Sequence, residues 1–364
     1  ASCLVGSEMC IRDRIYSDIY KLKPGQIIEV EFHKNEIALT KTIYWDPKSF
    51  VGNKKFSEKK MMNLLENSIK IRMNADVNIA NFLSGGIDST TIIKIANKFK
   101  KINTFSMSMK KSNFNEIFYF EKVAYKYGTN HKTISLDTDT LSRKEIDQSI
   151  LLFDEPYADP STIPSFLLSK EVSKKYKVAI SGDGGDEVFG GYKRTSLSLK
   201  EKSFFKNLFS KFYFIYPSFL GTGNKFLRHS RDTKEIYSSF LEDKKFMKLM
   251  KINYLSSFQE EYLNNTEDEL KNLLLCDLKF YLPEMMLLKI DRTSMANSLE
   301  VRSPFVDHRL VEYMLSCKLN NNILVNPKQQ LKTFLNQDFS LDFTDRSKMG
   351  FVFDLEKWIY NNSD

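Results

Sequence analysis

The chain has 364 residues, of which 42% are hydrophobic and 27% are charged. That length and composition are typical of a folded globular protein with a sizeable core, and they exclude the disordered and fibrous classes. The formal net charge is +8, from 54 Lys and Arg residues against 46 Asp and Glu residues, an excess that suits a polyanionic partner. The lysines are scattered in short pairs, however, so a solvated surface is favoured over a nucleic-acid interface.

Cysteine content and hydropathy indicate the cellular setting. Cys3, Cys10, Cys276 and Cys317 form no CxxC pair and lack the spacing of zinc ligands, which argues for a reducing compartment. No segment reaches the roughly 18 consecutive apolar residues that a membrane-spanning helix needs, and no signal peptide is recognisable. We therefore expect a cytoplasmic protein with no membrane partner.

The first fifty residues do not resemble a complete folding unit. Residues 1–13 lack an initiator Met and a periodic pattern, and we interpret them as a foreign leader. After the turn signal at residues 23–25, the alternating residues 26–32 predict a strand, with residues 36–43 as its hairpin partner. Because two strands do not fold alone, we expect this piece to be the trailing edge of a domain.

The middle of the chain alternates between strand and helix patterns. A helix is predicted over residues 57–74, with Ser57 as its cap. Strands are predicted at 77–83, 104–109, 131–136 and 178–181, and helices at 88–100, 116–127 and 163–175. This alternation predicts an α/β fold, in which a parallel sheet has helices on both faces. Beyond Lys193 the pattern is mainly helical to about residue 319.

A glycine loop directly follows the first strand of this region. Residues 83–90, LSGGIDST, pass from an apolar strand through two glycines into a helix. Glycines let the backbone approach a ligand closely, and free N–H groups at a helix start bind anions. Asp88 beside phosphates would make sense as a Mg²⁺ ligand. Alternatively, the segment is a tight turn with an acid in the first helical turn, and it lacks the Walker and dinucleotide-binding patterns.

A second glycine-rich loop, residues 181–192, follows the strand at 178–181. Its sequence SGDGGDEVFGGY contains three acids, which would repel one another unless a cation or a proton neutralised them. Such loops at the carboxyl ends of strands are where α/β sheets bind ligands. We therefore expect Asp186 to be a second Mg²⁺ ligand facing Asp88, the alternative being a surface turn with solvated acids.

Two further segments are chemically distinctive. Residues 154–161, DEPYADPS, are stiffened by prolines and on their own predict a connecting loop. Residues 288–308 carry Lys289, Arg292 and Arg302 among apolar residues. These cations would suit a salt-bridged helix and its exit, or equally an anionic substrate.

Taken together, the four segments occur in the order found in asparagine synthetases of the bacterial, glutamine-hydrolysing type. The resemblance covers about residues 50–360, and SGGIDS resembles the pyrophosphate loop of N-type ATP pyrophosphatases. It implies an adenine nucleotide alpha hydrolase-like fold with ATP and Mg²⁺ as cofactors. It also implies adenylation of the aspartate side-chain carboxylate to β-aspartyl-AMP with release of pyrophosphate, followed by attack of ammonia to give asparagine and AMP.

The resemblance also implies roles for individual residues. Asp88 and Asp186 would hold Mg²⁺, Asp183 would deprotonate the incoming amine, and Lys348, in the segment RSKMGF, would neutralise charge on the α-phosphate. The residues expected around ATP are Leu83, Ser84, Gly85, Gly86, Asp88, Ser89, Met107 and Gly182. The partners would be aspartate and ammonia, which is glutamine-derived in the full-length family; a homodimer is left open, and no nucleic acid is expected.

The N-terminal part departs from the family pattern. Residues 14–50 resemble only the end of the family's glutaminase domain, whereas residues 51–364 resemble its synthetase domain. Cys3 and Cys10 match no nucleophile motif, so we expect that this chain does not hydrolyse glutamine by itself. It would use free ammonia or depend on sequence outside this chain.

Other activities share these loops. They include a β-lactam synthetase-like or lasso-peptide cyclase and an amidotransferase acting on sugars. An RNA-modifying ATP pyrophosphatase is encouraged by the isoelectric point of about 9.0 but not by any recognisable RNA-binding module. A catalytically inactive scaffold is disfavoured by the two intact glycine loops.

Overall fold

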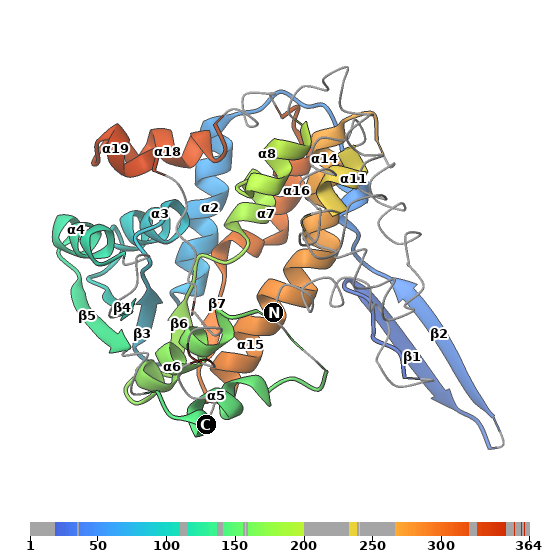
Figure 1. Ribbon diagram of the computed structural model, residues 1–364. Coiled ribbons are helices and arrows are strands. Elements are labelled where there is room, and N and C mark those ends of the chain that lie inside the picture. Colours follow the sequence, from blue (N-terminus) through green and yellow to red (C-terminus); the bar gives the residue numbers. More distant parts are fainter. Residues whose placement is uncertain are drawn as a thin grey trace, which may run out of the picture.

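A five-stranded parallel sheet lies at the centre of the computed structural model, in the order β5-β4-β3-β6-β7 (Figure 1). The structure describes residues 19–34, 36–109, 116–136, 141–155, 157, 159–199, 233–238, 240, 266–319, 326–346, 353, 358 and 360. The strands are β3 (Ile79–Phe82), β4 (Asn103–Met109), β5 (Asn130–Leu136), β6 (Val178–Ile180) and β7 (Glu300–Arg302). The predicted parallel sheet is confirmed, and β7 extends it by a short strand that the sequence did not reveal.

Helices cover both faces of this sheet because its buried strands are apolar on both sides. Ile79 and Val178 point into one core, and their neighbours Ala80 and Ala179 point into the other. The first core contains residues of α2 (Glu58–Arg72), α3 (Ile87–Ala96) and α4 (Ile117–Tyr127). The second contains residues of α5 (Arg143–Ile150) and α6 (Thr162–Ser173).

Local signals explain where two of these helices begin. The side chain of Ser57 accepts a hydrogen bond from the Lys60 amide and caps α2, as predicted. Ser142 and Glu145 form a reciprocal capping box at the start of α5, a helix that was not predicted although this signal is present in the sequence.

The described residues beyond Lys193 are mainly helical, as predicted. The helices among them are α8 (Lys193–Leu199), α11 (Thr233–Ser238), α14 (Glu269–Cys276), the π-helix η3 (Asp277–Leu287), α15 (Leu288–Met295), the 3-10 helix η4 (Pro304–Val306), α16 (His308–Ser316), α18 (Gln329–Leu335) and α19 (Leu341–Thr344). Pro283 lies inside η3. Because proline lacks an N–H and its ring crowds the preceding turn, the wider winding accommodates it.

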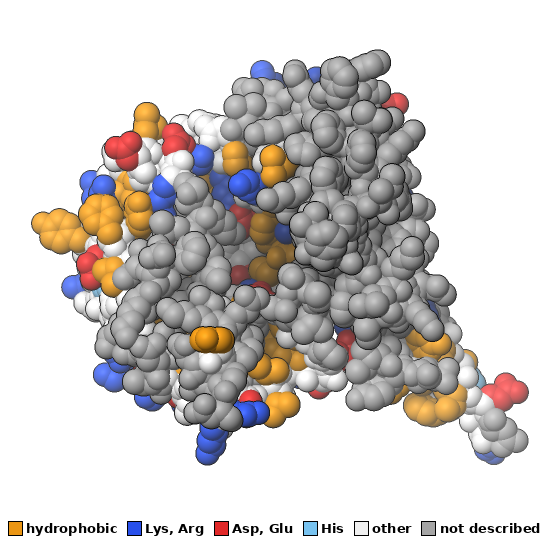
Figure 2. Space-filling model, in the orientation of Figure 1, with side chains coloured by type: hydrophobic (Ala, Val, Ile, Leu, Met, Phe, Trp, Pro, Cys, Tyr) orange, Lys and Arg blue, Asp and Glu red, His pale blue; other side chains and the backbone are white. Residues whose placement is uncertain are grey.

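The predicted hairpin is present as β1 (Gln26–Phe32) and β2 (Ile37–Ile43), an antiparallel ribbon that projects from the rest of the chain (Figure 1). Its base is joined to the main body through the short 3-10 helix η1 (Pro47–Phe50) and through Trp45, whose indole Nε1 donates to Glu312 on α16 at 2.9 Å. The ribbon itself is exposed on both faces, and hydrophobic side chains are visible on it in Figure 2. Its proposed origin as the end of a glutaminase domain stays a prediction.

The sheet topology places two loops side by side. The chain passes from β3 outward through β4 to β5, then returns to form β6 on the other side of β3. Such a reversal leaves a crevice at the carboxyl ends of the two central strands, where ligands bind in open α/β sheets. The glycine loop follows β3 and the acidic loop follows β6, so both open into this crevice. Among the described residues, no helix is long and apolar enough to cross a membrane.

Candidate active site at the carboxyl ends of β3 and β6

Hydroxyl groups organise the first glycine loop. The Ser89 hydroxyl lies 3.0 Å from the Ser84 hydroxyl, 3.3 Å from the Ser84 amide and 3.2 Å from the Gly86 carbonyl. The Gly86 amide donates to the Ser84 hydroxyl at 3.2 Å, and Gly86 precedes α3 without any side-chain cap. Several N–H and O–H donors are therefore gathered at the positive end of a ten-residue helix, an arrangement suited to phosphate.

Gly85 is required in this loop for two reasons. Its φ of +76° lies in the left-handed region, which is costly for other residues. A Cβ atom there would also lie 2.7 Å from the backbone nitrogen of Phe120 on α4. The predicted glycine turn is therefore pressed directly against a helix.

The acidic loop packs against Asp88 through its glycines. A Cβ on Gly182 would lie 3.2 Å from Asp88 Cβ and from the Ser89 amide, and one on Gly185 would lie 2.6 Å from Asp88 Cγ. Gly184, with φ of +88°, turns the chain into the short helix α7 (Gly185–Phe189). The glycine content of this loop thus reflects close approach between the two loops.

The two carboxylates predicted to bind metal lie on either side of one cation. The Nζ atom of Lys328 is 2.5 Å from Asp88 Oδ2 and 2.6 Å from Asp186 Oδ1. The Lys328 side chain is only 8% exposed and packs against Gly191, where a Cβ would overlap it. Sequence reasoning brought Asp88 and Asp186 together correctly but missed Lys328.

The third acidic position of the loop is neutralised differently. Glu187 is 1% exposed and accepts a hydrogen bond of 2.6 Å from the Tyr192 hydroxyl. Burial, with a further contribution from Asp186, raises the pKa of Glu187 to about 7. The repulsion expected among the three acids is therefore relieved at two of them, by the Lys328 ammonium group at Asp186 and by the Tyr192 hydroxyl at Glu187. The third acid, Asp183, is partly exposed to solvent.

A buried cluster supports the acidic loop from behind. The Arg194 guanidinium lies 3.8 Å from the ring centroid of Tyr192 and 3.9 Å from that of Tyr281. It also forms an ion pair of 2.6 Å with Asp277, which is fully buried. Since Tyr192 is held on one side by Arg194 and on the other by Glu187, the cluster fixes the position of the acidic loop.

The C-terminal part of the chain reaches the glycine loop through Arg346. Its Nη2 atom donates to the Gly85 carbonyl at 3.0 Å, and its guanidinium lies 3.7 Å from the Tyr119 ring centroid. It also forms an ion pair of 3.4 Å with Glu116. Lys348, predicted to act on the α-phosphate, lies outside the described residues.

The residues predicted to flank adenosine lie on neighbouring strands: Leu83 directly follows β3, and Met107 lies within β4, two residues before its end. Leu83 is 2% exposed and Met107 is 8% exposed, and they belong to the two different cores of the sheet. The Leu83 amide donates to the Phe105 carbonyl at 2.9 Å. Their contact with a nucleotide stays a prediction, as does that of Gly182.

The two remaining segments contact each other. Lys289 Nζ lies 2.7 Å from Asp159, and Arg292 lies 2.7 Å from Asp154, so the cations of α15 pair with the DEPYADPS loop. Arg302 donates to the carbonyls of residues 72 and 74 at 3.0 and 2.7 Å. These contacts support the salt-bridged alternative for this segment.

The donor set at Asp88 and Asp186 fits a magnesium ion bound together with a ligand. Among the described residues, no group of three or more His, Cys, Asp or Glu side chains could hold a metal ion. Mg²⁺ is usually bound by one or two carboxylates together with substrate phosphates and water, so two carboxylates beside a loop suited to phosphate match that pattern. Lys328 already shows that both carboxylates can approach a single positive charge.

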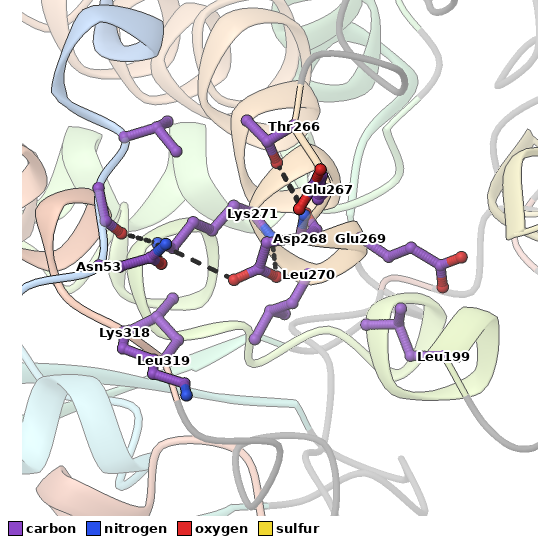
Figure 3. Close-up of a pocket in the computed structure, with 12 residues that line it drawn as sticks. Asn53, Leu199, Thr266, Glu267, Asp268, Glu269, Leu270, Lys271, Lys318 and Leu319 are labelled. Atoms are coloured by element: carbon purple, nitrogen blue, oxygen red, sulfur yellow. Dashed lines mark hydrogen bonds and ion pairs between the residues drawn. The ribbon is translucent and has the colours of Figure 1, made fainter.

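A cavity of about 640 Å³ lies elsewhere and contains none of the predicted site residues. Its lining comes from residues 51–53, Leu199, residues 266–271 and residues 318–319. Figure 3 shows Lys271 extending across it toward Asn53, and this lysine also donates to the Gly52 carbonyl. Because the cavity lacks the glycine-loop donors, we do not assign the nucleotide to it.

The chain is similar to a family of known proteins. The asparagine synthase family model matches residues 60–363. Asparagine synthetase (glutamine-hydrolyzing) 1 of Bacillus subtilis is 27% identical, covering 83% of this chain and 50% of its own length. A putative asparagine synthetase (glutamine-hydrolyzing) 2 of Methanocaldococcus jannaschii is 31% identical, covering 77% of this chain and 57% of its own. The chain thus spans about half the length of these relatives.

Among solved structures, an NH3-dependent NAD synthetase of Campylobacter jejuni matches with a TM-score of 0.30 and 14% identity, covering 64% of this chain and 96% of that one. The family match extends over both glycine loops, the DEPYADPS loop, α15 and Lys328. On that match, and with the two glycine loops meeting at one edge of the sheet, the chain belongs to the asparagine synthase family.

Proposed function

We propose that this chain is a carbon–nitrogen ligase that performs ATP-dependent asparagine synthesis. It would adenylate the side-chain carboxylate of aspartate, releasing pyrophosphate, and the resulting β-aspartyl-AMP would react with ammonia. The main support for the proposal is that Asp88 and Asp186, from two different loops, both contact the ammonium group of Lys328. Aspartate as the substrate is supported by the names of the relatives.

The glycine loop would bind the pyrophosphate part of ATP. No side chain caps the amides at the start of α3, so these N–H groups can donate to phosphate oxygens. The Ser84 and Ser89 hydroxyls lie beside them as further donors. Asp88 and Asp186 would hold Mg²⁺, which supplies neutralisation and orientation of the leaving pyrophosphate. This division of roles explains why the site combines hydroxyl donors with two carboxylates.

Two residues would assist the chemical steps, one at the attacking amine and one at the α-phosphate. Asp183 lies on the acidic loop and is partly exposed, so it is available to accept a proton from the attacking amine. Lys348 would stabilise the negative charge that develops on the α-phosphate. Arg346, two residues earlier in the sequence, donates a hydrogen bond to the glycine loop. From the cysteine content and the scattered lysines we also propose a cytoplasmic enzyme that needs no nucleic acid.

The test is pyrophosphate release by the purified chain with ATP, Mg²⁺ and ammonium, across a panel of carboxylic acids. We expect release with aspartate, with one AMP and one asparagine formed for each pyrophosphate. Aspartate labelled with ¹⁸O in its side-chain carboxylate should transfer one label to AMP. Release with a different acid and not with aspartate would refute the substrate, and stimulation by tRNA alone would refute the reaction class.

Matched acid variants test the metal assignment. Asp88→Asn and Asp186→Asn should each lower pyrophosphate release at least a hundredfold, because each removes a carboxylate that Mg²⁺ requires. Asp147→Asn, on the exposed side of α5 with only a 3.7 Å contact to Arg143, should keep full activity. Full activity of Asp88→Asn would contradict the assignment.

A further inference from the structure

Lys328 occupies a backbone position that its own residue type disfavours. Its φ is +62°, and in the part of the chain that the structure describes only Ser298 shares a left-handed backbone without being glycine. It directly precedes α18, where a positive charge faces the positive end of the helix, and it forms no side-chain cap. A non-glycine residue in this backbone conformation costs free energy and is characteristic of functional sites. A lysine in this unfavourable backbone conformation and at this end of a helix therefore indicates a functional role for its ammonium group.

The surroundings of Lys328 hold its ammonium group at the two carboxylates. Nζ lies 2.5 Å from Asp88 and 2.6 Å from Asp186, and the side chain is almost fully buried. On the far side, Gly191 leaves room for the lysine stem, since a Cβ atom there would overlap Lys328 Cε. Three segments distant in sequence, the two loops and the start of α18, therefore meet at one ammonium group.

A metal ion and this ammonium group compete for the same oxygens. Two carboxylates carry two negative charges, whereas Mg²⁺ and a lysine together carry three positive ones. Like charges a few ångströms apart repel strongly in a partly buried site. Pyrophosphate oxygens bound at the neighbouring glycine loop would supply the missing negative charge and a new partner for the lysine.

We propose that Lys328 is a displaceable counter-ion that also binds pyrophosphate. Without nucleotide, it holds Asp88 and Asp186 together; when the metal–nucleotide complex binds, its ammonium group leaves the carboxylates for the phosphate oxygens. The inference rests on the metal and pyrophosphate site proposed above, but not on aspartate being the substrate. It predicts opposite effects of one substitution on two ligands, which a purely structural role would not produce.

The first measurement is binding of Mn²⁺ alone, followed by the loss of the free-ion signal in electron paramagnetic resonance. Lys328→Met removes the competing charge, so Mn²⁺ should bind at least tenfold more tightly than to the parent chain. Calorimetric titration with Mg²⁺–pyrophosphate should show the reverse, at least tenfold weaker binding. Lys328→Gly, which relieves the left-handed backbone, gives a second variant with the same expected pattern.

Lys332 supplies the matched control on the same helix. It pairs with Asp345 at 3.0 Å and with Asn326 at 2.6 Å, and it contacts neither metal-binding carboxylate in the described contacts. Lys332→Met should leave the binding of both ligands within twofold of the parent chain.

Three outcomes would overturn the inference. Unchanged or weaker Mn²⁺ binding in both Lys328 variants would show that the lysine does not compete with metal. Tighter Mn²⁺ binding with unchanged pyrophosphate binding would show that the ammonium group does not move to phosphate. Absence of metal–pyrophosphate binding in the parent chain would refute the site itself. By contrast, if the Lys328 variants bind Mn²⁺ more tightly and Mg²⁺–pyrophosphate more weakly, but the parent chain shows no aspartate-dependent turnover, only the proposed substrate is refuted.

Discussion

Replacing Gly185 with alanine should greatly lower the enzymatic activity while changing the stability of the fold only slightly. The added methyl carbon would lie 2.6 Å from the Cγ and Oδ1 atoms of Asp88, whereas carbon atoms normally approach to about 3.5 Å. The Asp88 carboxylate must therefore move by roughly 1 Å, and a displacement of that size at a reacting centre can lower the rate about a hundredfold. The measured quantity is aspartate-dependent pyrophosphate release with saturating ATP.

The same substitution should change stability much less. Alanine in place of glycine at the start of α7 gains up to about 1 kcal/mol of helix propensity, which offsets part of an overpacking cost of about 1–3 kcal/mol. Thermal unfolding should therefore shift by a few degrees only. Gly128→Ala is the opposite control: its φ is +59° and nothing lies within 4 Å of the added Cβ, so it should lose about 1 kcal/mol and keep its activity. Gly185→Ala with activity within threefold of the parent chain would refute the reasoning.

Three further substitutions probe the contacts around the site. Arg346→Ala should raise the KM for ATP about tenfold with little change in thermal stability, because it removes the hydrogen bond to the Gly85 carbonyl; an unchanged KM would contradict this. Arg194→Met should lower the free energy of unfolding in urea by about 3–5 kcal/mol, since it leaves Asp277 charged and buried; the double variant with Asp277→Leu should recover most of the loss. Hydrogen bonds from Arg309 and Arg72 hold the pKa of Asp307 well below its usual range. The stabilisation of the fold by the Asp307 carboxylate is therefore fully present above about pH 4 and is lost as the pH falls further. Asp307→Asn should therefore destabilise the protein at pH 7 and pH 5 alike, and a deficit that instead grew toward pH 3.5 would reverse the assigned sign.

The central strands and the helices between them were predictable because each carries a local pattern. The ends of strand β3 and helix α3, for example, lie within four residues of their predicted positions, since the Ser-Gly-Gly turn separates the two elements. Asp88 and Asp186 could be paired from sequence because each follows a strand of one parallel sheet. In contrast, β7 has three residues and no alternation long enough to recognise.

Lys328 could not be predicted because its contact partners are distant in sequence. It lies 240 residues from Asp88, in the segment NPKQQ, which suggests only a turn before a helix. The Arg194–Asp277 pair spans 83 residues and is equally invisible to local patterns. A positive φ at a lysine is a property of the folded backbone, so its signal becomes visible only in the structure.

The β1–β2 ribbon affects how the protein must be handled in solution. Phe32 is 77% exposed, Ile37 63% and Leu39 61%, and within the described residues the outer edge of each strand of this two-stranded sheet pairs with no further strand. Exposed apolar edges of this kind pair with further copies and favour aggregation. Kinetic and binding constants should therefore be measured over a dilution series, because self-association through the ribbon would make them depend on protein concentration.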